Sequence, residues 1–252
     1  MNDEFYVGYS PKMPQGLARQ VRRAIALCFI VGAVCALLFA RSQRTFAPSV
    51  FEYGKELAFE GTIEASPYPA LVVPRPATTE GTTHVSRYTL VGTGKHGAEG
   101  ETALFVGKAV KLKGQLIYRD GETLIEVMPG TVAATDVPAA PNETAQDLGL
   151  VTLVGEIVDS KCYFGVMNPG GGKVHRDCAV RCLSGGIPPS FVTNDYNGAP
   201  ATFLLVGQYG EKLPKQYLLA GAGRAVTIRG AVSRVGDTLY LAANPSEISV
   251  NR

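Results

Sequence analysis

Three cysteines and one histidine, Cys162, His175, Cys178 and Cys182, lie within 21 residues of one another in the C-terminal half of the chain. His175, Cys178 and Cys182 are spaced i, i+3 and i+7, so a short helix over 175–183 would place all three on one face. A glycine-rich segment separates Cys162 from this helix and lets the chain fold back. One imidazole and three thiols are ligand types of a tetrahedral zinc site. The spacing therefore predicts a Cys3His metal cluster.

The same cluster also suits copper, because thiolate and thioether sulfurs are soft ligands. Met167 is then an additional candidate ligand. Three other interpretations stay open. An oxidising compartment favours a disulfide from Cys162 to Cys178 or Cys182, which would leave one thiol over. That remaining thiol would allow thiol–disulfide exchange, and the last interpretation is that the cysteines only pack in a core.

The cluster falls in an expected insertion, residues 159–191, between two predicted strands of a β-rich domain. Its segment PGGGK, residues 169–173, predicts a flexible turn and no phosphate loop, since no serine or threonine follows the lysine. Gly185 and Gly186 are expected to end the helix. The corresponding part of the preceding β-rich domain has no cysteine. Only the second of the two domains is therefore expected to carry this chemistry.

Two β-rich domains are predicted, over residues 55–132 and 148–252, with a flexible alanine- and proline-containing linker over 133–147. Both end in a predicted hairpin, residues 107–127 and 223–243, in which apolar and polar residues alternate. Asp-Gly and Gly-Asp pairs supply the hairpin turns. The matching order of the predicted strands and hairpins in the two domains indicates a tandem repeat.

Short, bent strands in units of this size predict a mainly β fold with two tandem small β-barrels of the OB-like Greek-key type. Glycines at matching places inside the last hairpins favour the sharp bends that small barrels need. A small β-sandwich is the alternative for each domain.

Residues 24–40 read AIALCFIVGAVCALLFA and carry no charge. A helix of this length is at the short end of what a bilayer core requires. We interpret it as one transmembrane anchor between a cytoplasmic tail, residues 1–23, and a linker, residues 41–54. A buried core helix would show a polar face, and a cleaved signal peptide would show a clearer small-x-small site.

Basic residues are more numerous before the anchor than after it, which predicts a cytoplasmic N-terminus and an extracytoplasmic bulk. The residues concerned are Lys12, Arg19, Arg22 and Arg23 on one side, and Arg41 and Arg44 on the other. The expected location is the inner (cytoplasmic) membrane, single-pass, with both β domains in the periplasm. An oxidising compartment is what keeps the disulfide alternative open.

The composition sets further limits. With 24 basic and 22 acidic side chains the formal net charge is +2, from which we predict no nucleic-acid partner. Lys95 and His96 are expected at a solvated loop tip. No nucleophile elbow or paired catalytic acids stand out, so the pattern favours a protein that is not an enzyme.

The function predicted from these features is that of a membrane-anchored accessory or binding protein. Its Cys3His cluster would hold zinc or copper and serve a membrane redox or assembly system, with other membrane-complex subunits as partners. The first alternative is a non-catalytic structural subunit of a membrane complex with a disulfide-stapled loop. The second is a thiol–disulfide oxidoreductase.

Overall fold

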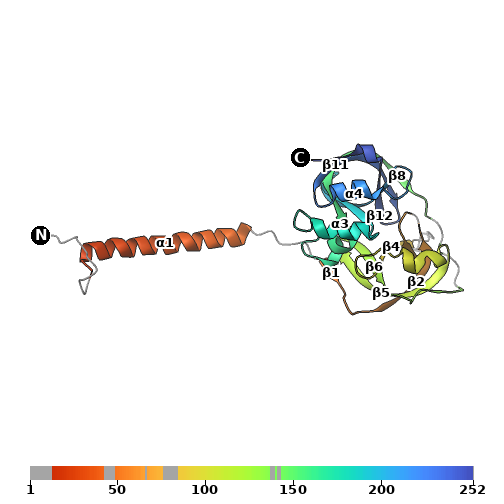
Figure 1. The fold of residues 1–252 in the computed structure, drawn as a ribbon, viewed down its shortest axis with the longest axis horizontal. Helices are drawn as coiled ribbons and strands as arrows, with labels where there is room; N and C mark the ends of the chain where they lie inside the picture. The colour runs from red at the N-terminus through yellow and green to blue at the C-terminus, as the bar shows by residue number, and fades with distance from the viewer. Residues whose placement is uncertain are drawn as a thin grey trace. The chain divides into compact units, whose positions relative to one another are not determined.

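The computed structural model describes residues 13–42, 49–65, 67–75, 85–136, 140 and 143–251. The chain divides into two compact units, Met1–Phe46 and Ala47–Arg252. The first unit contains helix α1, and the second contains every described strand (Figure 1). Each unit is described by itself below.

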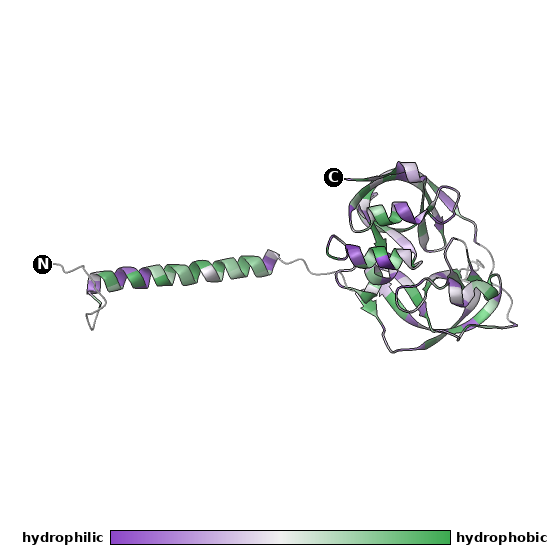
Figure 2. Cartoon of the chain, in the orientation of Figure 1, coloured by the Kyte–Doolittle hydropathy of each residue, from purple (hydrophilic) through white to green (hydrophobic). Residues whose placement is uncertain are grey.

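Helix α1 spans Gln15–Ser42. Its 28 residues make a helix about 42 Å long at a rise of 1.5 Å per residue. Its hydrophobic residues follow a more polar first part (Figure 2), and none of its residues is buried. The helix is long and apolar enough to cross a bilayer, a property that membrane anchors and signal sequences share. It begins inside the predicted tail, residues 1–23, and ends after the predicted span, residues 24–40.

Seven described strands form the first sheet. Their bounds are β1 Ser49–Phe51, β2 Leu57–Glu64, β3 Ala70–Pro74, β4 Val85–Val91, β5 Ala109–Arg119, β6 Glu122–Val127 and β7 Ala133–Ala134. Strands β5, β2, β3, β4 and β6 pair in that order, and β6 pairs back to β5. The result is a closed five-stranded β-barrel, as predicted for this domain. All its pairings are antiparallel except β4 with β6.

The alternating pattern of β5 explains how this barrel acquires a core. Val110 and Leu112 are fully buried, whereas Lys111 and Lys113 between and after them are exposed. In a strand, successive side chains point to opposite faces, so one face lines the barrel and the other meets solvent. The predicted hairpin forms from β5 and β6, and Asp120 and Gly121 at its turn have φ values of 52° and 87°.

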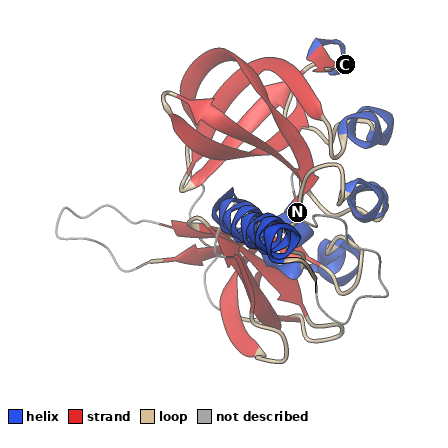
Figure 3. Ribbon diagram, turned by 90° about the vertical axis from the view of Figure 1, so that its left-hand side faces the viewer, coloured by secondary structure: helices blue, strands red, loops and turns tan. Residues whose placement is uncertain are grey.

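Six described strands form the second sheet, and Figure 3 shows the strands in two groups. Their bounds are β8 Gln146–Asp159, β9 Pro189–Tyr196, β10 Ala199–Gly207, β11 Ala225–Val235, β12 Thr238–Ala243 and β13 Ile248–Val250. The pairing order is β12, β10, β9, β8, β11, β13, and β12 also pairs with β11. The second predicted hairpin is this antiparallel pair of β11 and β12.

Short helices join the strands. Their bounds are α2 Glu99–Thr102, η1 Ala103–Phe105, the π-helix η2 Cys162–Val166, α3 Arg176–Ser184, α4 Lys215–Gly221 and η3 Pro245–Glu247. The helix predicted over 175–183 is α3, with His175 at its N-cap and Gly185 at its C-cap. The helices η2 and α3 both lie in the predicted insertion, residues 159–191.

An apolar cluster connects the first sheet with the predicted insertion. Val91, Ile117 and Leu124 come from the first sheet, while Phe164 and Ile187 come from the predicted insertion. Cys162 and Cys182 belong to the same buried cluster. Cys162 and Cys182 therefore lie where the insertion packs against the first sheet.

The predicted linkers are partly strand. Residues 49–51 of the segment 41–54 form β1, and residues 133–134 of the segment 133–147 form β7. Both short strands pair with β5. Residues 43–48, 137–139 and 141–142 of these linkers lie outside the described residues.

Candidate metal site

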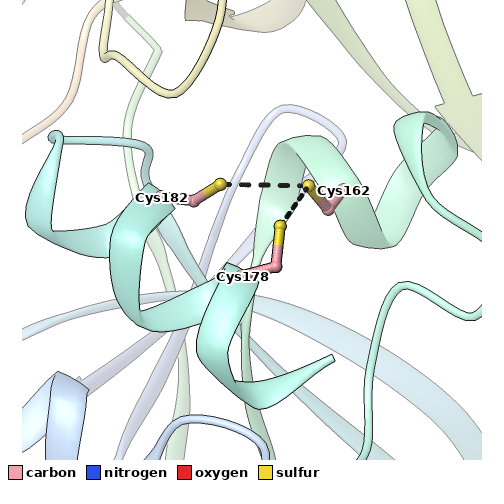
Figure 4. Close-up of side chains that lie close together, drawn as sticks. All are labelled: Cys162, Cys178 and Cys182. Carbon is pink, nitrogen blue, oxygen red and sulfur yellow. Dashed lines mark hydrogen bonds between the residues drawn. The ribbon is translucent and has the colours of Figure 1, made fainter. Parts of the chain in front are cut away.

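Cys162, Cys178 and Cys182 form the three-cysteine site. Cys162 is the first residue of η2, while Cys178 and Cys182 lie one turn apart on α3. Figure 4 shows the three thiols turned toward one another. The Sγ atom of Cys162 lies 3.9 Å from the Sγ atoms of both Cys178 and Cys182. All three sulfurs lie within 4.8 Å of one another, the spacing of a group that can hold a metal ion.

A buried carboxylate connects the two elements that carry these thiols. Asp159, the last residue of β8, accepts a hydrogen bond on Oδ1 from the backbone N–H of Cys162 at 2.8 Å. Its Oδ2 lies 3.0 Å from Nε2 of His175. Both side chains are buried. Because His175 begins α3, the Asp159–His175 pair sets the position of that helix relative to Cys162.

The glycine-rich segment before α3 lets the chain fold back closely over η2. A Cβ atom on Gly170 would lie 2.5 Å from the carbonyl oxygen of Cys162 and from the Cα atom of Tyr163. Such a contact is shorter than carbon and oxygen atoms tolerate, so a side chain at residue 170 would force the segment outward. The predicted return of this loop is confirmed, and Gly170 is the residue that requires glycine.

Lys95, from the loop after β4, completes the surroundings of the site. Its Nζ atom donates to Sγ of Cys178 at 2.8 Å and lies 3.7 Å from Sγ of Cys182. Lys95 is exposed and Cys178 half-buried, so this is the solvent side of the site. The hydrogen bond to Cys178 raises the pKa of Lys95. The lysine therefore stays a cation beside the sulfurs.

Residues 92–97, here called the 92–97 loop, hold Lys95 in this place. The backbone N–H of Gly97 donates to the carbonyl oxygen of Gly185 at 3.1 Å, just after α3. A Cβ atom on Gly185 would overlap the carbonyl oxygen of Lys95, so this contact requires glycine. The loop after β4 thus supplies a cation to thiols on η2 and α3.

Buried Lys161 fixes the other side of the 92–97 loop. Its Nζ atom donates to the carbonyl oxygens of Gly92 at 2.7 Å and Gly94 at 2.8 Å. It also forms an ion pair of 3.0 Å with Glu126 on β6, with side chains only 4% and 9% exposed. These contacts satisfy the three N–H donors of the ammonium group.

The thiols differ in acidity. The pKa of Cys182 is lowered to about 7, first because Cys162 hydrogen-bonds to its sulfur and also because of the charge of Lys95, while burial opposes the change. The pKa of Cys162 is raised by the same hydrogen bond and by burial. A proton shared in this way favours a thiolate at Cys182, and thiolate is the form that binds metal.

The sulfur separations match those around a bound metal ion. With metal–sulfur bonds of about 2.3 Å, two sulfurs lie about 3.8 Å apart in a tetrahedral site and about 4.0 Å apart in a trigonal one. The two separations of 3.9 Å from Cys162 fit both geometries, and the third pair of sulfurs lies within 4.8 Å. All three cysteines are free thiols. The arrangement is therefore able to bind a thiophilic metal ion.

The other predicted site residues have different surroundings. His175 belongs to a second group of candidate ligand atoms, with Asp159 and Cys162, and its role as a fourth ligand stays a prediction. Met167 is exposed and follows η2. The disulfide between Cys162 and Cys178 or Cys182 also stays a prediction, because the sulfurs are close but unbonded.

Sequence reasoning placed Lys95 at a solvated loop tip and missed its contact with the thiols. Lys95 is 83 residues from Cys178 in the sequence, and no local spacing connects them. Among the basic residues near Cys178 in the sequence, Lys173 and Arg181 are exposed and Arg176 is half-buried. Asp159 was likewise missed as a residue that positions the site, although it opens the insertion.

No protein-family model and no curated protein matches this chain. Among solved structures, the chain is similar to a deletion variant of the single-stranded DNA binding protein from Thermus aquaticus. The match covers 81% of this chain and 95% of the other, with 13% sequence identity and a TM-score of 0.22. A likeness this weak carries no functional argument.

The partner prediction is nevertheless corrected. It named membrane-complex subunits and excluded nucleic acid, whereas the matched structure is that of a DNA-binding protein. The exclusion depended on a net charge of +2, and net charge does not reveal how basic residues are distributed over one face of a domain. Neither part of that prediction is kept.

Proposed function

We propose that this protein is a membrane-anchored metal-binding protein in which Cys162, Cys178 and Cys182 hold one thiophilic ion. The observation that carries the proposal is the convergence of three free thiols from η2 and α3, with the sulfur of Cys162 3.9 Å from each of the other two and all three within 4.8 Å of one another. Thiolate ligands select Zn²⁺ and Cu⁺ among common metal ions. Part of each sulfur's surroundings is apolar, because Cys162 and Cys182 lie in a buried cluster.

Charge favours Zn²⁺ as the resident ion. Three thiolates carry three negative charges, and the ammonium group of Lys95 beside them carries one positive charge. A divalent ion makes this set neutral, whereas a monovalent ion leaves one negative charge in a site that is largely buried. Uncompensated charge is costly in such surroundings. Copper(I) is the alternative that the soft ligands allow.

Helix α1 supports a location at a membrane, and the surplus of basic residues on its N-terminal side supports a periplasmic position for the rest of the chain. In an oxidising compartment a bound metal would keep the three thiols from pairing. We also propose that the second sheet is a barrel repeating the first, because β12 pairs with both β10 and β11 and so completes a ring. Both barrels would then be of the OB-like type predicted from the sequence.

Metal content tests the proposal. The full chain, purified in mild detergent under reducing conditions and loaded with Zn²⁺, should retain one zinc ion per molecule by mass spectrometry of the metal. Cys178→Ser should lower zinc affinity by roughly a hundredfold, since one of three thiolates is lost. The matched control is Cys28→Ser with Cys35→Ser, which removes two thiols from α1.

The control variant should bind zinc like the unaltered chain. Reduced protein that retains no ion, with all three thiols titrating as free, would overturn the proposal. A copper(I) competition on the same sample decides between the two ions. Retention of copper in the presence of excess zinc would replace Zn²⁺ by Cu⁺ as the resident ion.

Thiol–disulfide exchange is a second candidate function, favoured by the lowered pKa of Cys182 next to two other thiols. A thiolate there would attack the disulfide of a protein substrate, forming a mixed disulfide and releasing the other sulfur as a thiol. Insulin reduction with dithiothreitol as the electron donor tests it. Equal rates for the unaltered chain and Cys182→Ser would exclude this function.

A further inference from the structure

The three-cysteine site offers a metal ion three ligands. Among the described residues, the groups of candidate ligand atoms are the three sulfurs and a second set, Asp159, Cys162 and His175. The second set shares only Cys162 with the first. His175 is not part of the first set, and its Nε2 lies 3.0 Å from Asp159, away from solvent. A tetrahedral ion bound by the three sulfurs therefore has one position left for another ligand.

The ammonium group of Lys95 lies on the solvent side of the three-cysteine site. It contacts the sulfurs of Cys178 and Cys182, and Cys178 is the only half-buried member of the three-cysteine site. A charged ammonium group has no lone pair and cannot itself ligate a metal. What it can do is stabilise negative charge in the space next to it.

Lys95 is held in place by backbone contacts as well as by its own side chain. Gly97 is hydrogen-bonded to Gly185, and the carbonyl oxygens of Gly92 and Gly94 accept from buried Lys161. Anchors on both sides of Lys95 limit how far its Cα atom can move. A cation set in advance beside an open coordination position is the arrangement that recognises an anionic ligand.

On the basis of the proposed metal site, we infer that the bound ion takes a small anion from solution as its fourth ligand, that the negative charge this anion adds lies on the solvent side of the site, and that Lys95 is the cation nearest to it. The ligand class is a monoanion with a sulfur or nitrogen donor atom, either a low-molecular-weight thiolate or an inorganic anion such as azide. A thiol would bind by losing its proton to water as its sulfur replaces a water molecule on the metal. No electron is transferred in this step.

Cobalt(II) in place of zinc makes the fourth ligand visible, because its absorption bands depend on coordination. The full chain in detergent is loaded with Co²⁺ and titrated with azide in one series and with 2-mercaptoethanol in another. Each addition that binds should shift the visible spectrum in a saturable way. A response to the thiol alone identifies a thiolate ligand, and a response to azide alone identifies an inorganic anion; both outcomes support the inference.

Variants of the lysine test its role. Lys95→Gln should weaken anion binding by about tenfold while Co²⁺ remains bound, since the loss is that of one nearby charge. Lys95→Arg, which keeps the charge, should restore most of the affinity. The matched control is Lys173→Gln, an exposed lysine near α3, which should leave the titration unchanged.

Two results would overturn the inference. In one, Co²⁺ binds but neither anion alters its spectrum, which means that the protein already supplies four ligands. In the other, Lys95→Gln binds the anion as tightly as the unaltered chain. Failure to bind Co²⁺ at all is a different result, because it contradicts the proposed function itself.

Discussion

Lys161 has an ammonium group that lies inside the protein with all three donors used. Its partners are Glu126 on the first sheet and the carbonyl oxygens of Gly92 and Gly94. Removing one partner of a buried ion pair destabilises a protein far more than replacing both partners by apolar residues, because the other charge is left without compensation. This single side chain therefore has a large effect on the contact between the two sheets.

Lys161→Met is expected to destabilise the Ala47–Arg252 unit by about 3–5 kcal/mol, since Glu126 stays buried without a cation. Urea unfolding of the full chain in detergent measures this through the fluorescence of its tyrosines, as the chain has no tryptophan. Lys113→Met, on the exposed face of β5, is the control and should change stability by less than about 0.5 kcal/mol. Equal effects of the two substitutions would contradict the assigned role of Lys161.

Glu122 has a pKa that is raised from 4.5 to about 7, first by burial and then by the charge of Asp237. The folded protein therefore binds more protons at this residue than the unfolded chain between these two pH values. Stability consequently falls as the pH rises through that window. A carboxyl pKa raised by this much lowers the free energy of unfolding by at most roughly 3 kcal/mol above pH 7.

Glu122→Gln should remove this pH-dependent loss. We expect the variant to match the unaltered chain near pH 4.5 and to exceed it by about 1–3 kcal/mol at pH 8, less than the upper limit because the side chain is partly exposed. Urea unfolding at a series of pH values measures the difference. A constant difference across the series would mean that Glu122 does not titrate in this window.

At the scale of elements, the close approach of the 92–97 loop to α3 depends on Gly185. A methyl group there would overlap the carbonyl oxygen of Lys95 and push the loop away. Gly185→Ala is expected to cost about 1–3 kcal/mol and to weaken zinc binding, because Lys95 loses its place beside the thiols. Thermal unfolding and zinc competition measure the two effects.

Gly100→Ala is the matched control for that substitution. Gly100 lies in α2 of the same connecting segment, and a Cβ atom there would meet no atom within 4 Å. Alanine is the better helix former, so this variant should be at least as stable as the unaltered chain. If Gly185→Ala behaved in the same way, the 92–97 loop would not depend on the contact.

The elements that local pattern determines could be predicted. Alternation along β5 and the Asp120-Gly121 turn predicted the first hairpin, and the spacing of Cys178 and Cys182 with Gly185 predicted α3. The cation beside the thiols could not be predicted in this way. Lys95 reaches the site only because the two sheets pack together, and that packing depends on contacts between residues far apart in the sequence. The glycines between Cys162 and α3 did predict that the chain folds back and brings Cys162 close to that helix.

At the scale of the whole molecule, α1 is expected to keep the protein at the membrane. Arginine at both Leu27 and Val34 should abolish membrane retention in cell fractionation, since a charge at the centre of a span costs about 2.5–3.5 kcal/mol per residue. Leu150→Arg, at an exposed apolar residue of β8, is the control and should remain with the membranes.

The mass of the isolated protein separates the two uses of such a helix. A full-length mass is expected, with α1 retained as an anchor. A mass that lacks α1 would instead identify the helix as a signal sequence. The three-cysteine site lies in the other compact unit, so zinc content should be the same in the arginine variant and the unaltered chain.

The placement of Lys95 and Lys161 has a thermodynamic consequence. Thiols on the insertion of the second β domain and a cation on the 92–97 loop of the first make metal affinity a property of the docked pair, so by linkage the ion stabilises docking as much as docking strengthens the affinity for the ion. The two sheets should accordingly melt as one cooperative unit. Removing the metal with a chelator should lower the midpoint of that shared transition. The fraction of protein with bound metal then reports how completely the two domains are docked.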